Sequence, residues 1–450
     1  MKAGYYKKAP LFLVLFFFFY KTHLYAQSPL EKENTFSISA QIRPRTEWRN
    51  GTFQPLTHAQ KPAVLISQRN RLQFMYQYKQ KLSLQLSPQQ VVIWGQDGLT
   101  QNAGSSNGIA FFDAWAQWHF DSSTSIQIGR QVLSLDDERI LGALDWAQGA
   151  RTHDGIALNY NTHQWDAKLF AAYNQNYKEL YGNNTGNASG ALYSARNATP
   201  YKWMQTAWGR YKINTTHSLS GLLSNWGFQN ALHAADSAKN YSLLTTGLHY
   251  SYSTTALRYH ASAYTQLGHN AQGAKTNAYL LSAGMGYQPH SKWNFQIAAD
   301  FVSGNSHNDS TQNINRAFNP MLGTNHKFYG AMDYFFAGNG HKNTGLTDVY
   351  FKTGYQSTKQ YSVQLALHQF YSAGKIKDAM HQYKANLGQE LDIDFNYAMH
   401  KFVKLTGGYS LYLTTPTILF LKSVADAPRS QHWGWLAINI HPQLFKTKYN

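Results

Sequence analysis

From position 36 to the C-terminus, apolar and polar side chains alternate in one short segment after another. A period of two is typical of a β-strand with one apolar and one polar face. No long stretch keeps a helical period. About 18 segments of roughly 8–15 residues predict an all-β fold, a transmembrane antiparallel β-barrel of about 18 strands. The segments begin near Phe36, Val64, Leu82, Ile109, Ser125, Arg151, Trp165, Tyr201, Ser218, Tyr241, Thr255, Asn277, Lys292, Thr347, Tyr361, Lys384, Phe402 and Gln431.

The connections between these segments alternate between short and long. Short ones include Lys79–Lys81, Asp121–Thr124 and Asn214–His217. A β-sandwich does not require this alternation, whereas an outer-membrane barrel has short periplasmic turns and long extracellular loops. We therefore expect the barrel, and the sequence leaves open whether its long loops fold into the lumen. The long connections, rich in Gly, Asn and Ser, include Gly95–Gly108, Val132–Ala150, Gln175–Pro200, Ser303–Leu346 and Thr414–Ser430.

The first 26 residues have the features of a secretory signal peptide. They contain a basic start, an apolar run over Leu11–Tyr20 and a small residue, Ala26, at the expected cleavage site. The apolar run is too short for a membrane-spanning helix, and no longer one occurs elsewhere. We expect cleavage near Ala26, with residues 27–450 forming the barrel in the outer membrane of a Gram-negative cell, in contact with its lipid. Because the chain has no cysteine, disulfides and thiolate metal sites are excluded.

The charge of the chain favours anionic partners. The formal net charge is +17, and removal of the four lysines of the leader leaves 17 − 4 = +13. The basic residues are spread singly along the chain, and the leader directs it to secretion, so we do not expect nucleic acid as a partner. The 19 histidines show no metal-ligand spacing, and we expect no metal, no cofactor and no catalytic residues. Periplasmic partner proteins cannot be named from the sequence.

The alternation also separates the charged side chains from the lipid. In the first strand Phe36, Ile38 and Ile42 share one face, so the charged residues share the other. A charge facing lipid at mid-membrane costs about 2–4 kcal/mol, so the apolar face must be the outer one. Applied to each strand, this rule predicts the following pore-lining residues: Arg43, Arg45, Glu47, Arg49, Arg69, Arg71, Asp113, Arg151, Lys168, Arg258, Glu390, Asp392 and Asp394.

One further arginine is counted with the pore lining although its position does not fit the alternation. Arg130 has the parity of Ile126 and Ile128, which face lipid. It requires either a β-bulge or a strand that has already left the membrane. For any single arginine two roles remain open, a structural ion pair across the barrel wall or contact with a solute. As a group, the basic excess should make the field of the channel positive and favour anions.

Three stretches resemble one family, the alginate export outer-membrane β-barrels. They are "GRQVLSLDDERILGALDWAQGARTHDGIAL" (129–158), "AFNPMLGTNHKFYGAMDYF" (317–335) and "LGQELDIDFNYAMHKFVKLTGGYS" (387–410). The resemblance implies a lumen lined by arginines that passes an anionic uronate polysaccharide or oligosaccharide. Unlike the well-characterised exporters, the chain has no extended periplasmic turn that could serve as a plug. The positions that match the family's motifs are Arg130, Asp145, Trp146, Arg151 and Asp154, together with Arg43, Arg45, Arg69 and Arg71 in the first strands.

Two other functions compete with this one. A general or nutrient-uptake porin for small anionic or neutral solutes needs the same barrel, and the sequence encodes neither the direction of flux nor the solute. An outer-membrane hydrolase would need a histidine and a serine on the lipid side, and His260 and Ser262 have a suitable spacing. Their neighbours Tyr259 and Ala261 take the lipid face, so this pair is expected to point into the lumen. We therefore expect a channel and no enzyme.

Overall fold

The structure is a computed structural model, and it describes residues 34–95, 108–174, 201–229, 240–307, 313–336 and 340–449. The expected signal peptide and the expected long loops at 96–107 and 175–200 lie outside these residues. No described helix is long and apolar enough to cross a membrane.

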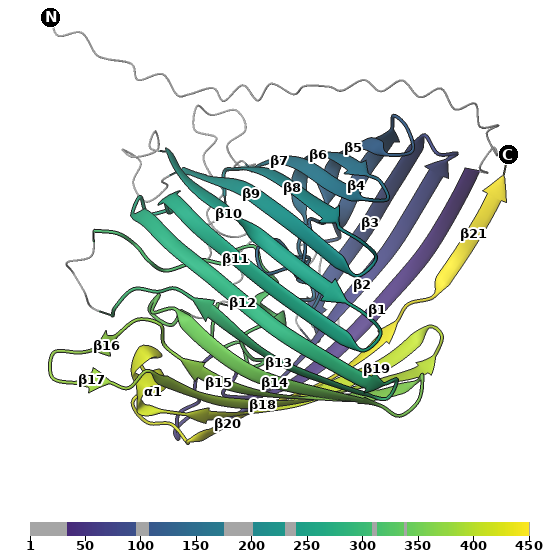
Figure 1. The fold of residues 1–450 in the computed structure, drawn as a ribbon. Coiled ribbons are helices and arrows are strands. Elements are labelled where there is room, and N and C mark those ends of the chain that lie inside the picture. The colour runs from purple at the N-terminus through teal and green to yellow at the C-terminus, as the bar shows by residue number, and fades with distance from the viewer. Residues whose placement is uncertain are drawn as a thin grey trace, which may run out of the picture. The chain divides into compact units, whose positions relative to one another are not determined.

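The chain forms a closed antiparallel β-barrel in which successive strands are neighbours (Figure 1). The sheet has 19 segments, but β20 and β21 both pair with β1 as successive parts of one strand, so the barrel has 18 strands. Pairing of β1 with β2 on its other side closes the ring. The strands are β1 (Asn34–Asn50), β2 (Ala63–Tyr78), β3 (Leu82–Ile93), β4 (Ala110–His119), β5 (Thr124–Gln131), β6 (His153–Asn161), β7 (Trp165–Tyr173), β8 (Trp203–Lys212), β9 (His217–Gln229), β10 (Asn240–Ser253), β11 (Leu257–His269), β12 (Lys275–His290), β13 (Trp293–Val302), β14 (Leu346–Gln356), β15 (Tyr361–Tyr371), β18 (Asn386–His400), β19 (Val403–Thr414), β20 (Ser430–Ile440) and β21 (Gln443–Tyr449).

The predicted fold is confirmed, and each predicted strand begins within two residues of an observed one. The additional elements are short and lie in the long loops. Among the described residues they are a small hairpin of β16 (Ile376–Lys377) and β17 (Gln382–Tyr383), the helix α1 (Pro416–Leu421) and the 3-10 turn η3 (Asn325–Lys327).

The two ends of the barrel differ in their connections. One end, called here the turn end, holds the eight short connections, such as 79–81 and 401–402, and both ends of the described chain. The opposite end, the loop end, holds the long connections together with α1, β16 and β17. In Figure 1 the turn end is on the right and the loop end on the left.

The outer face of the wall is apolar, as the alternation predicts. Leu72 on β2, Ile128 on β5 and Ile156 on β6 are exposed on it, with 41%, 51% and 49% of their surface accessible. Exposed aromatic side chains, among them Tyr78 and Trp118, gather near the turn end. This is the distribution that a membrane-spanning barrel requires, because amphipathic rings favour the membrane–water boundary.

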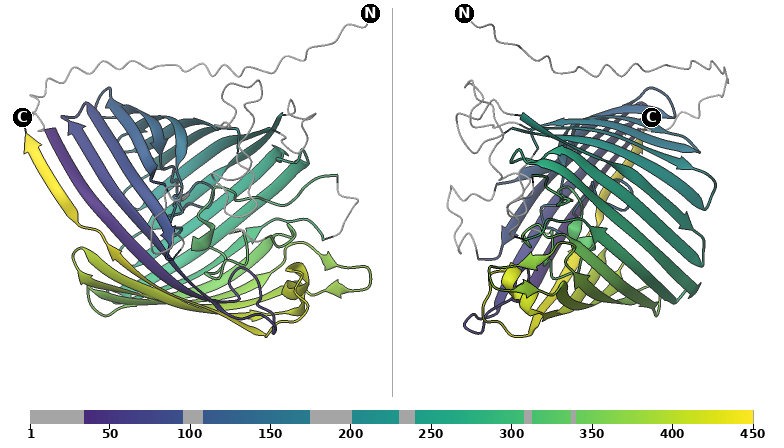
Figure 2. Two further views of the ribbon diagram at one scale, coloured as in Figure 1. Left: turned by 180° about the vertical axis from the view of Figure 1, so that it is seen from behind. Right: turned by 60° about the vertical axis from the view of Figure 1, so that its left-hand side comes forward.

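The largest buried apolar cluster lies inside the barrel, where two long connections fold into the lumen. Residues 132–152 join β5 to β6 and are called here the first inward loop; residues 313–336, between β13 and β14, are called the second inward loop. Leu141 and Leu322 from these loops pack in one cluster with inward side chains of the wall such as Trp226 and Tyr412. Figure 2 shows these coil segments inside the ring of strands.

Candidate functional site

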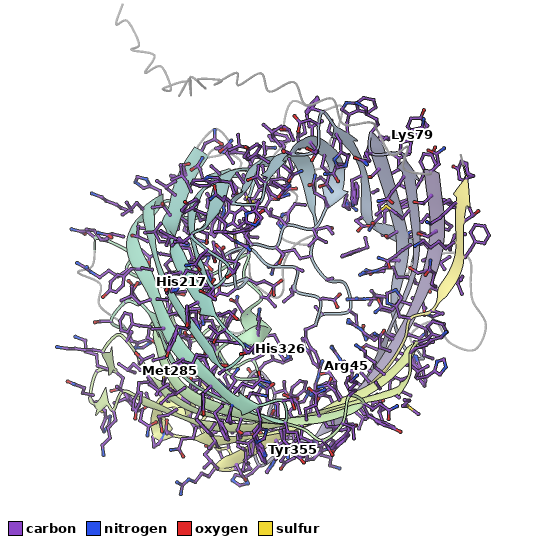
Figure 3. All side chains as sticks on the ribbon, turned by 45° about the vertical axis from the view of Figure 1, so that its right-hand side comes forward. Arg45, Lys79, His217, Met285, His326 and Tyr355 are labelled. Atoms are coloured by element: carbon purple, nitrogen blue, oxygen red, sulfur yellow. The ribbon has the colours of Figure 1, made fainter. Side chains whose placement is uncertain are left out.

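Five arginines on two adjacent strands form a basic cluster that faces the lumen. Arg43, Arg45 and Arg49 on β1 and Arg69 and Arg71 on β2 are called here the arginine tier. The strands pair so that Arg43 lies directly opposite Arg69, and every residue of the tier has inward parity. In Figure 3 Arg45 lies inside the ring of strands. Five cations this close together require anionic or carbonyl partners.

The first inward loop supplies most of these partners. The fully buried guanidinium of Arg69 donates to the Asp145 carboxylate at 2.7 Å and to the main-chain carbonyls of Ala147 and Gln148 at 2.6 Å each. Arg43 donates to the Gln148 side chain at 3.1 Å, and Arg45 donates to the carbonyl oxygen of Trp146 at 2.8 Å. Part of the tier therefore holds the loop against the wall.

A buried carboxylate neutralises another part of the tier. Glu47 accepts from Arg45 and from Arg49, each at 3.0 Å, and from the indole N–H of Trp433 at 3.3 Å. Arg71 lies over the ring of Phe112 at 3.5 Å. Arg43 and Arg49 keep 14% and 29% of their side-chain surface exposed, so they are the members of the tier most accessible from the lumen.

An aromatic contact joins the two inward loops beside the tier. The ring of Trp146 stacks on His326 with centroids 4.4 Å apart, and Arg45 lies over its ring at 4.1 Å. His326 in turn contacts the Asp333 carboxylate at 2.9 Å. Figure 3 shows His326 inside the barrel on the side facing Arg45.

Two more arginines hold the first inward loop in place, and both are buried. Arg151 donates to the carbonyl oxygens of Gly142, Leu322 and Gly323, and so ties the two inward loops together. Burial lowers the pKa of Arg151 to about 10. Arg139 pairs with Asp137 and with Asp300 on β13, each at 2.8 Å. Arg139 was not among the sequence-based candidates, because it lies in a loop, where strand parity has no meaning.

The wall from β13 to β18 is acidic. His368 on β15 contacts the carboxylate of Asp348 at 2.9 Å and that of Asp392 at 3.9 Å. Glu390 on β18 accepts from the main-chain N–H of Met332 at 2.7 Å and so holds the second inward loop. Asp394 is half-buried. Among the described residues no group of three His, Asp or Glu side chains is placed to hold a metal ion.

The structure places Arg130 on the outer face, which corrects the prediction that it lines the pore. Its pairing with β4 and β6 runs without interruption, so it keeps the parity of Ile128. The guanidinium binds both oxygens of Asp154, at 2.7 and 2.8 Å, and donates to the carbonyl oxygen of Phe111. A bidentate pair resolves the conflict that the sequence showed, because each charge is neutralised by the other.

The remaining candidates also have inward positions. Asp113 accepts from Gln85 at 2.6 Å, and Lys168 donates to Asn159 at 2.5 Å. Arg258 donates to Gln288 at 3.2 Å. His260 and Ser262 also have inward parity, but they bond different partners, Ser282 and His249 respectively.

The comparisons with known proteins agree with this fold. A family model described as alginate export matches residues 37–414. A search of curated proteins found no match. The solved structure of Pseudomonas aeruginosa OpdL is 12% identical with a TM-score of 0.61, and the match covers 91% of this chain and 99% of that one. Pseudomonas aeruginosa OccK11 (OpdR) is 12% identical with a TM-score of 0.59, and the match covers 92% of this chain and 99% of that one. Pseudomonas aeruginosa OprD is 10% identical with a TM-score of 0.60, and the match covers 91% of this chain and 96% of that one. At these identities the likeness shows the fold.

Proposed function

The chain belongs to the alginate export family, and on this premise we propose that it is an outer-membrane channel that passes an anionic polysaccharide or oligosaccharide of the uronate type. The observation that supports this solute is the arginine tier. Its five guanidinium groups are turned inward, and Arg43 and Arg49 remain partly exposed beside the first inward loop. A guanidinium fork matches the geometry of a carboxylate, and every residue of a uronate chain carries one.

Transport also requires that each contact be weak enough to release the solute. Arg45 and Arg49 already donate to the carboxylate of Glu47, and Arg43 already donates to a carbonyl oxygen of the first inward loop. A passing carboxylate must compete with these partners, which lowers the affinity of each step. The tier then acts as a series of exchangeable contacts and does not form one tight site.

A porin for small anionic or neutral solutes is the second candidate. It is favoured by the two inward loops, which pack against the wall and occupy part of the lumen. Adding an oligouronate distinguishes the two proposals. It should block ion flow through a channel that binds it and should have no effect on a porin that excludes it.

The contribution of the arginine tier is tested by removing its two accessible charges. We expect the variant Arg43→Gln with Arg49→Gln to lose part of its preference for chloride over potassium, measured as the reversal potential in a planar bilayer under a KCl gradient. The control is Lys377→Gln with Arg429→Gln, which removes two exposed charges at the loop end. If the reversal potentials of both variants equal that of the native chain, the tier plays no part in selectivity.

A further inference from the structure

A second group of inward cations lies at the turn end, separate from the arginine tier. Their inward position follows from the strand register: Lys446 lies opposite Ser37, between outward Phe36 and Ile38. Each lies within four residues of a short turn or of the last described residue. At a strand rise of about 3.3 Å, this is within roughly 13 Å of the barrel end. These residues, called here the turn-end collar, are Lys168 on β7, Arg210 on β8, Arg258 on β11, Lys404 on β19, and Lys446 and Lys448 on β21.

The turn end as a whole has a large excess of positive charge. We count the eight short turns and, in each strand, the four residues nearest the turn end. Within the described part of the chain these contain 12 lysines and arginines and 2 acids, so the balance is 12 − 2 = +10. Both acids already have partners. Asp166 pairs with Lys212 at 2.9 Å, and Asp121 accepts from the main-chain N–H groups of Ser123 and Thr124 in its own turn. Within the described residues, these two acids therefore leave a net excess of +10 at the turn end.

The collar differs from the arginine tier in its accessibility. Arg258, Lys404, Lys446 and Lys448 are exposed, and Arg258, Lys404 and Lys446 form no ion pair with any acid in the described ranges. The tier, in contrast, is largely engaged by Glu47 and the first inward loop. On β1, the residue opposite Lys446 is six positions from Arg43, or about 20 Å along the strand. A solute that enters at the turn end thus meets the collar before the tier.

We propose that the turn-end collar is the capture site for a polyanion that enters from the turn side, so that the channel is loaded from the periplasm. This inference rests on the proposed function. Short turns of outer-membrane barrels face the periplasm. Lysines are point charges on flexible stems, so they attract carboxylates without fixing one geometry, and a field of one sign raises the association rate of an oppositely charged solute by about 10–1,000-fold. Capture at the collar and transfer to the guanidinium forks gives the path a direction of loading.

The test measures current block by an oligouronate of defined length, added to one side of a planar bilayer at a time. Because the chain has no cysteine, a single Met380→Cys substitution in the exposed hairpin of the loop end can report the orientation of the barrel in the bilayer. An impermeant thiol reagent labels this cysteine only from the side on which the loop end lies. The collar variant combines Arg258→Gln, Lys404→Gln, Lys446→Gln and Lys448→Gln. The matched control removes four exposed charges at the loop end: Lys375→Gln, Lys377→Gln, Lys384→Gln and Arg429→Gln.

We expect the native chain to be blocked at least tenfold faster from the turn side than from the loop side at low salt, and the difference to shrink as salt is added. The collar variant should lose this difference and keep the loop-side rate, whereas the control should keep the native pattern. Equal rates from both sides in the native chain, or a collar variant that behaves like the control, overturn the inference but leave the proposed function standing. If the collar instead binds anionic lipid headgroups, its variant changes insertion into anionic bilayers without changing block, which also overturns the inference. Absence of block from either side overturns the proposed function, and the inference with it.

Discussion

Arg69 of the barrel wall and Asp145 of the first inward loop form a salt bridge of 2.7 Å in which the guanidinium is fully buried and the carboxylate is 61% exposed. The same guanidinium donates to three main-chain carbonyl oxygens of the loop, those of Asp145, Ala147 and Gln148. The charge of Arg69 is thus used to hold the loop inside the lumen. An arginine that the sequence places in the pore lining can therefore act on the channel through a loop and need not touch the solute.

Replacement of Arg69 by glutamine should release the first inward loop. Each charge-assisted hydrogen bond that is lost weakens docking by about 1.5–3 kcal/mol. We expect a larger and noisier single-channel conductance and faster hydrogen exchange at the main-chain amides of residues 145–148. Arg49→Gln is the control for the exchange measurement, because Arg49 bonds Glu47 and not the loop. Native conductance and native exchange in Arg69→Gln would show that the loop is held by other contacts.

Gly330 should be needed for docking of the second inward loop. It has a φ of +84°, and a Cβ at this position would lie 2.4 Å from a carboxylate oxygen of Glu390. Gly330→Ala therefore adds backbone strain of about 1–2 kcal/mol and a clash with the residue that accepts from Met332. We expect faster hydrogen exchange at the Met332 amide and a changed conductance. Gly149→Ala, where a Cβ meets no atom within 4 Å, should behave like the native chain.

The outward pair of Arg130 and Asp154 should matter for stability and not for selectivity. Removal of either partner leaves a charge in the wall without its bidentate contact, at a cost of about 1.5–3 kcal/mol. We expect Arg130→Gln and Asp154→Asn each to lower the unfolding temperature of the barrel in detergent, and the double variant to lower it by less than the sum of the two. The reversal potential under a KCl gradient should remain native. A shift in that potential would contradict the outward position of Arg130 and indicate that it lines the pore.

Docking of the second inward loop should depend on pH through Lys422, which follows α1. Its ammonium donates to the carbonyl oxygens of Tyr334 and Gly340, at 2.5 and 3.4 Å. Burial lowers the pKa of Lys422 to about 7, whereas a solvated lysine has a pKa of about 10.4. Between these values the released loop binds more protons than the docked one, so docking strengthens as pH rises and weakens as pH falls toward 7. Burial lowers the pKa of the neighbouring His341 to about 3, so His341 stays neutral throughout this window.

The measurement is hydrogen exchange of the main-chain amides near Tyr334 between about pH 7 and pH 10, corrected for the intrinsic rate. Protection should increase with pH in the native chain. Lys422→Met should abolish this dependence, and Lys384→Met, at an exposed position of the loop end, should retain it. A dependence that persists in Lys422→Met would assign it to another group.

Much of the fold could be predicted from the sequence because strand parity is a local signal. The alternation around Phe36 and Arg43 is visible within a few residues, and it gives both the strand and the direction of each side chain. The partners of the arginine tier are not local, since Arg69 and Gln148 are 79 positions apart and meet only because a loop turns inward. Composition does not show which loop does so. The stretch around Asp145 and Trp146 resembles a family motif, and this resemblance was the one signal in the sequence that the loop matters. It does not show that the loop contacts the arginine tier.

We propose above that the lumen of this channel selects acidic saccharides. The most direct test is the reversal potential of the refolded native chain in a planar bilayer under a KCl gradient, repeated after an oligouronate is added. We predict a preference for chloride and a current that the oligouronate blocks. A preference for potassium, or an undiminished current in the presence of the oligouronate, would contradict the claim and favour a general porin in the same barrel.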